Sequence, residues 1–122
     1  MLRAYDCLSD ADYLFRDDRL NRIPNCCYYA VFDAVSALLR TEELFVKTHK
    51  GAKSKFNEFF IKTGRMPDES NEWLERCYEL RQSGDYDFSY EVNPADAVIA
   101  MEYAKEFLLH VEAYLRSMDL VN

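Results

Sequence analysis

The sequence has few of the residues that interrupt helices or build metal and redox sites. Only three glycines and three prolines occur among 122 residues, which excludes a collagen-like, low-complexity or loop-dominated chain. No apolar run approaches membrane-spanning length, and acidic residues interrupt the N-terminal segment where a signal peptide would be apolar. The four cysteines include no pair with C-x-x-C spacing: Cys7, Cys26, Cys27 and Cys77. We therefore expect a cytoplasmic protein with reduced core thiols, no metal and no cofactor.

The chain is rich in the residues that form a core. Hydrophobic residues make up 49% of it and aromatic residues 15%. A length of 122 residues lies within the usual span of one domain. We predict a single domain over residues 1–122, which folds by itself or as an oligomer.

Positive charge is scarce overall but concentrated in one segment. The net charge of −7 opposes binding to nucleic-acid phosphates on average. Residues 46–65 nevertheless carry six cationic side chains and one glutamate, a local charge of +5, so the remainder carries −12. This segment is either the solvated face of a helix or a surface for phosphate or an acidic partner. Its candidate binding residues are Lys47, Lys50 and Lys53.

Apolar residues recur at helical spacing almost throughout, and no strand alternation persists. We predict helices over residues 2–16, 24–40, 52–63, about 69–82 and 94–118, with a linker over 41–51. Gly64 is expected to end the third helix, and Asn93 and Pro94 to begin the last. The Gly84-Asp85 break is predicted to be the turn between the last two helices. Short connections favour antiparallel neighbours, so the expected fold is all-α, an up-and-down bundle of about five helices.

Four segments carry a family resemblance, which covers nearly the whole chain. In order and spacing they resemble small bacterial and archaeal HEPN-domain proteins. The segments are "NCCYYAVFDAVSALL" (Asn25 to Leu39), "KTHKGAKSKF" (Lys47 to Phe56), "RQSGDY" (Arg81 to Tyr86) and "AKEFL" (Ala104 to Leu108).

The resemblance implies a helical bundle that is commonly a homodimer and is often encoded beside a minimal nucleotidyltransferase as a toxin–antitoxin pair. Many HEPN proteins are metal-independent ribonucleases. Their site combines an arginine, a histidine separated from it by four to six residues, and a polar residue at the start of an earlier helix. The guanidinium stabilises charge on the phosphorane, and the histidine moves the proton of a ribose 2′-hydroxyl.

By this resemblance Arg81 matches the family arginine, and Asn25 matches the polar position. The histidine is absent, because Tyr86 and Phe88 stand where it would follow Arg81. Tyrosine, with an ordinary pKa near ~10, is a poor general base at neutral pH. Arg81 alternatively pairs with Asp85 or another carboxylate and closes the helix end. Tyr86 is also a candidate acceptor for AMP from a nucleotidyltransferase partner.

Two histidines could replace the missing one. His49 lies in the basic linker, where it either bonds backbone groups and fixes the entry to the third helix or joins Arg81 in a cleft. His110 is expected on the surface or in packing. The Tyr28-Tyr29 pair is expected in core and dimer packing, and Tyr29 is also a candidate ligand contact.

Two functions therefore remain open. The first is a non-catalytic or degenerate HEPN module, a dimer that docks a nucleotidyltransferase or binds nucleotide or RNA through Arg81 and residues 46–65. The alternative is a metal-independent ribonuclease in which His49, or arginine alone, replaces the histidine. A metal-carboxylate bundle would need paired Glu-x-x-His motifs, and neither histidine has a glutamate three residues before it.

Overall fold

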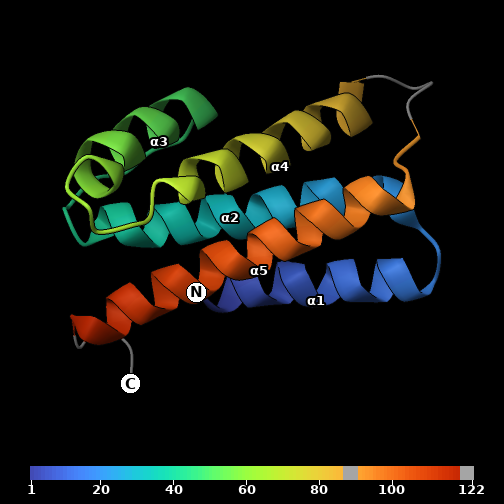
Figure 1. The fold of residues 1–122 in the computed structure, drawn as a ribbon, viewed down its shortest axis with the longest axis horizontal. Coiled ribbons are helices and arrows are strands. Elements are labelled where there is room, and N and C mark those ends of the chain that lie inside the picture. Colours follow the sequence, from blue (N-terminus) through green and yellow to red (C-terminus); the bar gives the residue numbers. More distant parts are fainter. Residues whose placement is uncertain (87–90, 119–122) are drawn as a thin grey trace.

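Four long helices run along the axis of an elongated bundle and alternate in direction (Figure 1). The computed structural model describes residues 1–86 and 91–118, with no side chain described for residues 84–86. A shorter helix, α3, and the π-helical turn after it lie beside α2 and α4. The predicted all-α, up-and-down bundle is confirmed. The helices are α1 (Leu2–Arg16), α2 (Ile23–Arg40), α3 (His49–Phe56), α4 (Glu69–Tyr86) and α5 (Pro94–Ser117).

The predicted signals at two helix ends are confirmed. Asn93 is the N-cap of α5, and its side-chain oxygen accepts a hydrogen bond from the Asp96 amide at 2.8 Å. Pro94 occupies the first turn, where a missing amide hydrogen costs no intrahelical bond. Gly64, with φ of +76°, adopts the left-handed conformation that ends the helical segment before it.

The third helix begins earlier than predicted. It starts at His49 instead of Ala52, because Thr48 caps it and the Thr48 hydroxyl accepts a hydrogen bond from the Gly51 amide at 3.0 Å. His49 is therefore a helical residue, and its assignment to a linker was wrong. After Phe56 the chain continues as a π-helical turn over Asn57–Ile61.

The fourth helix ends later than predicted. It extends to Tyr86, so the Gly84-Asp85 break lies inside α4 and its assignment to the turn before α5 was wrong. A glycine within a helix costs only about 1 kcal/mol relative to alanine, which the packing of the rest of the helix offsets.

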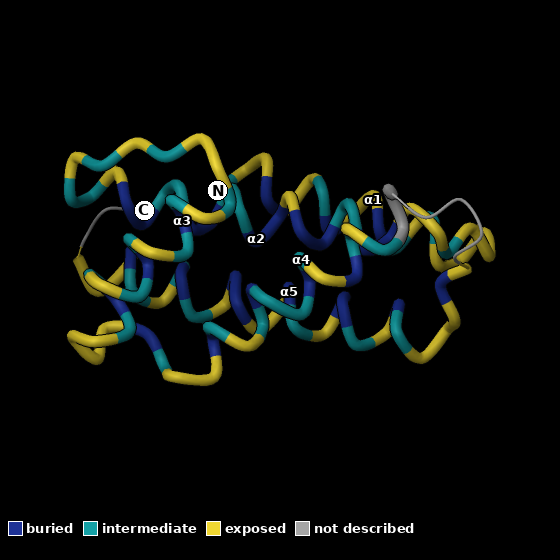
Figure 2. Tube along the Cα trace, turned by 90° about the horizontal axis from the view of Figure 1, so that it is seen from above, coloured by how far each residue is buried: buried dark blue, intermediate teal, exposed yellow. Residues whose placement is uncertain are grey.

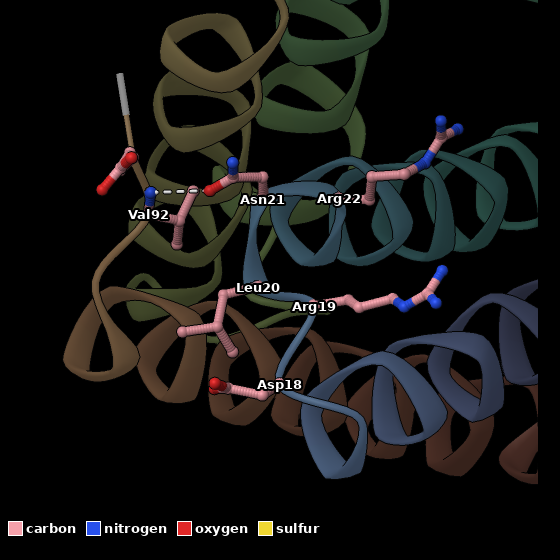
Figure 3. Close-up of a pocket in the computed structure, with 7 residues that line it drawn as sticks. Asp18, Arg19, Leu20, Asn21, Arg22 and Val92 are labelled. Carbon is pink, nitrogen blue, oxygen red and sulfur yellow. Dashed lines mark hydrogen bonds between the residues drawn. The ribbon is translucent and has the colours of Figure 1, made fainter. Parts of the chain in front are cut away.

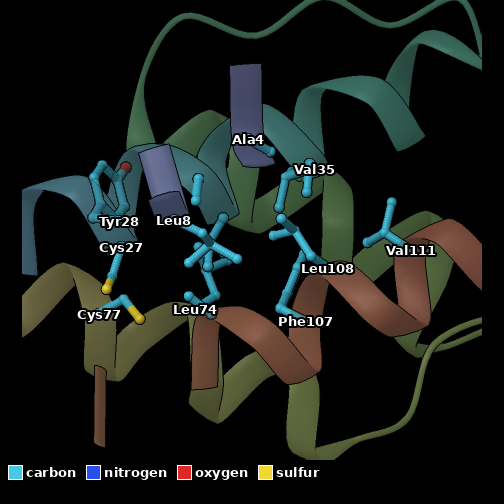
Figure 4. Packing of buried hydrophobic residues seen from close by; sticks show 14 of the residues in the cluster. Ala4, Leu8, Cys27, Tyr28, Val35, Leu74, Cys77, Phe107, Leu108 and Val111 are labelled. Carbon is cyan, nitrogen blue, oxygen red and sulfur yellow. The ribbon is translucent and has the colours of Figure 1, made fainter. Parts of the chain in front are cut away.

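The core forms around α2, which contacts every other α-helix of the described chain. Figure 2 shows the buried segments facing the interior between the helices. Figure 4 shows side chains of α1, α2, α4 and α5 meeting there. All four cysteines are free; Cys27 and Cys77 are buried as predicted, whereas Cys7 and Cys26 are half-buried. None of the described helices combines the length and apolar composition needed to cross a bilayer.

Truncation of Phe107 is predicted to destabilise this core. The Phe107 ring is 0% exposed, and its centroid lies 5.4 Å from that of Phe56. Phe107→Ala should lower the free energy of unfolding by about 3–5 kcal/mol through lost burial and the cavity left behind. Urea denaturation of the two proteins measures the difference.

The matched control is Leu109→Ala on the same helix, since Leu109 is 58% exposed. That substitution should change the free energy of unfolding by no more than about 0.5 kcal/mol. Similar losses of stability in both variants would contradict the assigned core.

Candidate functional site

A pocket of about 280 Å³ opens between α2, the start of α3 and α4, and we call it the Arg81 pocket. Helix α2 supplies three aromatic residues and α4 supplies residues spaced three and four apart, which share one helix face. The segment that leads into α3 closes the pocket. It is lined by Tyr28, Tyr29, Phe32, Lys47, His49, Tyr78, Arg81 and Gln82.

His49 is held by contacts from two helices. Its Nδ1 lies 3.1 Å from the Tyr28 hydroxyl oxygen, and its Nε2 lies 2.8 Å from a carboxylate oxygen of Glu75. Its ring stacks on that of Tyr78, with centroids 3.6 Å apart and planes 6° from parallel. In the neutral tautomer that fits, Nε2–H donates to Glu75 and Nδ1 accepts from Tyr28. Protein groups therefore engage both ring nitrogens.

Glu75 joins this network to the basic segment. The same carboxylate oxygen that His49 contacts also lies 3.3 Å from Nζ of Lys53. Burial of the carboxyl acts to raise its pKa, but hydrogen bonds from His49 and Lys53 outweigh burial, and the pKa of Glu75 is lowered. Glu75 is thus an ionised acceptor at neutral pH.

Arg81 lies over the aromatic pair of α2. Its guanidinium carbon is 5.2 Å from the ring centroids of both Tyr28 and Tyr29, within range of a cation–π interaction. Its Nη2 donates to the Tyr29 hydroxyl oxygen at 3.3 Å. Burial raises the pKa of Tyr28 above its ordinary value, although the Arg81 charge acts to lower it. Tyr28 is therefore a neutral hydroxyl at physiological pH.

A second hollow of about 380 Å³ adjoins the Arg81 pocket, and we call it the Lys50 hollow. The stacked rings of His49 and Tyr78 line both spaces. The Lys50 hollow is lined by His49, Lys50, Lys53, Ser54, Asn57, Glu75 and Tyr78. Of the three lysines named from the sequence, Lys47 therefore lines the first space, and Lys50 and Lys53 line the second.

The structure brings some of the sequence-predicted site residues together. Arg81, Tyr29 and His49 meet in one pocket, although they are far apart in the chain. Asn25 is half-buried one turn before Tyr29 on α2 and is not among the described residues that line the pocket. The side chains of Asp85 and Tyr86 lie outside the described residues, so the proposed Arg81–Asp85 pair and the AMP-acceptor role stay predictions.

His110 lies apart from this site on α5. Its Nδ1 is 2.9 Å from the Glu106 carbonyl oxygen, and its ring centroid is 5.3 Å from that of Trp73. These local contacts leave His49 as the histidine that accompanies Arg81.

Sequence reasoning missed Glu75, Tyr78 and Gln82. These residues follow the i, i+3, i+7 pattern of one helix face, and Gln82 Nε2 donates to the Tyr78 hydroxyl oxygen at 2.5 Å. The helical spacing of these residues was visible in the sequence, and their face lies beside the predicted buried side of α4. The packing of His49 against this face, which makes it part of a site, was not visible there.

A separate hollow of about 400 Å³ lies where the α1–α2 turn meets the segment before α5 (Figure 3). The Asn21 side-chain oxygen accepts a hydrogen bond from the Val92 amide at 3.0 Å there. Arg19 and Arg22 line the hollow, but both side chains point away from Val92, and Arg19 pairs with Asp17 at 2.8 Å. Their charges do not converge on this space. Nowhere in the described part of the chain do three or more metal-ligating side chains gather.

Proteins that contain a HEPN domain are similar to this chain. The HEPN-domain family profile matches residues 1–114. A Thermotoga maritima protein named "UPF0332 protein" is 34% identical over 116 residues, which cover 95% of this chain and 88% of that protein. A Methanocaldococcus jannaschii protein named "Putative toxin MJ0142" is 34% identical over 107 residues, 88% of this chain and 70% of that protein. Another from that organism, "Putative toxin MJ0605", is 31% identical over 83 residues, 68% of this chain and 62% of that protein.

The lowered pKa of Glu75 predicts how stability depends on pH. Because folding lowers that pKa, the ionised carboxylate stabilises the fold at pH values above 4.5, the ordinary pKa of the group. The contribution is lost as the pH falls through the lowered value. Glu75→Gln removes the charge but keeps an oxygen acceptor for His49. The variant should therefore be less stable than the wild type at neutral pH, and the difference should shrink below pH 4.5.

Urea denaturation at a series of pH values measures this difference. Glu102→Gln is the control, since Glu102 is exposed on α5 and lies outside both spaces. It should differ from the wild type by less than about 0.5 kcal/mol at neutral pH. A stability difference for Glu75→Gln that stayed constant down to strongly acidic pH would refute the charged role of Glu75.

Proposed function

Because this chain belongs to the HEPN-domain family, we propose that it is a toxin-like module that binds RNA in the Arg81 pocket without cleaving it. The observation that carries the proposal is that Arg81 shares its pocket with His49, whose two ring nitrogens both contact protein groups. An arginine in a pocket can bind a phosphate by itself, whereas proton transfer needs a base that reaches the ligand.

The pocket has the groups that bind a nucleotide. A guanidinium presents a planar fork of donors that matches two phosphate oxygens, and Lys47 adds a second positive charge. Tyr29 is 46% exposed, so part of its ring is available for stacking with a base. Stacking on an aromatic side chain contributes about 1–3 kcal/mol per base in single-stranded nucleic acid.

The groups that would move a proton are poorly placed for cleavage. Both ring nitrogens of His49 lie within hydrogen-bond distance of protein groups, Nδ1 near Tyr28 and Nε2 near Glu75, so a 2′-hydroxyl would have to displace a protein partner. Tyr28 is 3% exposed, and burial raises its pKa, so the phenolate that could accept a proton is hardly populated at neutral pH and lies in a covered position. These contacts favour binding over catalysis.

A metal-independent ribonuclease is the second candidate. It is favoured by the presence of His49 and Arg81 in one pocket and by relatives whose names describe a toxin. In that case, RNA binding would open the Tyr28–His49 hydrogen bond and free Nδ1 to act as the base. Contacts of catalytic residues can rearrange on ligand binding, so experiment has to separate the two functions.

Assembly forms a further part of the proposal. Family resemblance supports a homodimer and a minimal nucleotidyltransferase partner. In such a dimer, two Arg81 pockets would serve one RNA or one partner protein.

The test is RNA binding and metal-free cleavage by the wild type and Arg81→Ala. The wild type should bind a fluorescent single-stranded RNA, and Arg81→Ala should bind about ten- to a hundredfold more weakly, because hydrogen bonds to a charged group contribute about 1.5–3 kcal/mol each. Neither protein should cleave the RNA with a chelator present. Fluorescence anisotropy and gel analysis give the two readouts.

Arg40→Ala is the matched control, because Arg40 is exposed at the far end of α2 and its substitution removes the same charge. This variant should bind RNA within about twofold of the wild type, since Arg40 lies outside the site. Cleavage by the wild type but not by Arg81→Ala would favour the ribonuclease instead. Equal RNA binding by wild type and Arg81→Ala, or no binding by either, would overturn the proposed function.

A further inference from the structure

The Arg81 pocket and the Lys50 hollow share a wall formed by two lining residues, His49 and Tyr78. The wall is the parallel stack of His49 and Tyr78, with ring centroids 3.6 Å apart. His49 is fixed by Tyr28 on one side and Glu75 on the other. The two spaces are therefore neighbours that share these two residues, and not parts of unrelated surfaces.

Both spaces carry positive charge. Their described lining residues include four cationic side chains, Lys47, Lys50, Lys53 and Arg81, and one carboxylate, a net charge of +3. The chain as a whole carries −7, so the remainder carries −10. The carboxylate is that of Glu75, which His49 and Lys53 already contact. An anionic ligand would thus meet positive charge on both sides of the wall.

The two spaces differ in chemistry. The Arg81 pocket offers a guanidinium and aromatic rings, which suit a phosphate together with a base. The Lys50 hollow offers two ammonium groups, which suit a second anionic group without geometric demands. A mononucleotide would satisfy the first space and leave the second unused.

We propose that the two spaces form one groove for a single RNA strand, with one phosphate in the Arg81 pocket and a neighbouring phosphate at Lys50 and Lys53. The groove rests on the proposed function and adds that the ligand is an oligonucleotide. The His49–Tyr78 stack separates consecutive nucleotides. The Lys50 hollow thereby contributes affinity only to ligands that are longer than one nucleotide.

The experiment compares a nucleoside monophosphate with a trinucleotide and a longer single-stranded RNA. Wild type should bind the trinucleotide about tenfold or more tightly than the monophosphate, as a second charged interaction adds affinity. Lys50→Glu should remove most of this gain, so that the variant binds the trinucleotide and the monophosphate with similar affinity. It should also reduce the slope of log affinity against log salt for the longer RNA by about 0.7 for each phosphate that the variant no longer neutralises.

Lys62→Glu is the matched control because it makes the same charge change in the same basic segment. Lys62 is exposed and lines neither space. It should leave binding of all three ligands within about twofold of wild type. Lys50→Glu is expected to fold, since Lys50 is exposed in the first turn of α3. A carboxylate there interacts favourably with the positive end of the helix dipole. Circular dichroism checks this.

Two outcomes would overturn the groove alone. They are equal affinity of the wild type for the trinucleotide and the monophosphate, and equal weakening of trinucleotide binding by Lys50→Glu and Lys62→Glu. A different outcome would overturn the proposed function, and the groove with it: Arg81→Ala binds the monophosphate as well as the wild type does, or the wild type binds none of the three ligands.

Discussion

The position of the His49 ring is the constraint on which the site depends. His49 begins α3, and its contacts with Tyr28 of α2 and with Glu75 and Tyr78 of α4 fix the start of the basic segment against the bundle. Without those contacts, α3 would lose the hydrogen bonds that His49 makes to α2 and α4, and its lysines, which carry like charge, would repel one another. The ionised Glu75 draws both His49 and Lys53 toward α4. This connection places Lys47 and His49 at the Arg81 pocket, which they line.

Much of the fold could be predicted from the sequence, because local signals and tertiary structure agree there. The N-cap of α5, the end at Gly64 and the apolar face of α2 each follow from residues within a few positions of one another. One error arose where packing overrode a local signal, because Gly84 did not end α4. The other arose where a local signal was missed, because Thr48 caps α3 before the expected first residue.

The cationic residues of the site could be predicted from the sequence, but the contacts between its residues could not. Arg81 and Lys47 stand out as charged residues in segments that resemble a family. Glu75 does not, since one glutamate on an acidic chain has no distinguishing pattern. Glu75 belongs to the site because its carboxylate oxygen lies 2.8 Å from Nε2 of His49, a residue 26 positions away in the sequence. Such long-range pairs are set by how α3 docks, and helical periodicity carries no information about that docking.

The absence of a histidine shortly after Arg81 limits what this arginine can do. A phosphodiester is already anionic in the ground state, so a guanidinium binds it before any bond changes. Interactions that are equally strong in the ground and transition states increase affinity without increasing turnover. Cleavage also needs a base whose action begins only as the 2′-hydroxyl attacks, and here the nearby imidazole bonds to Tyr28 and Glu75. Under the proposed function, an arginine without a free base would therefore bind the RNA phosphate and leave the phosphodiester intact.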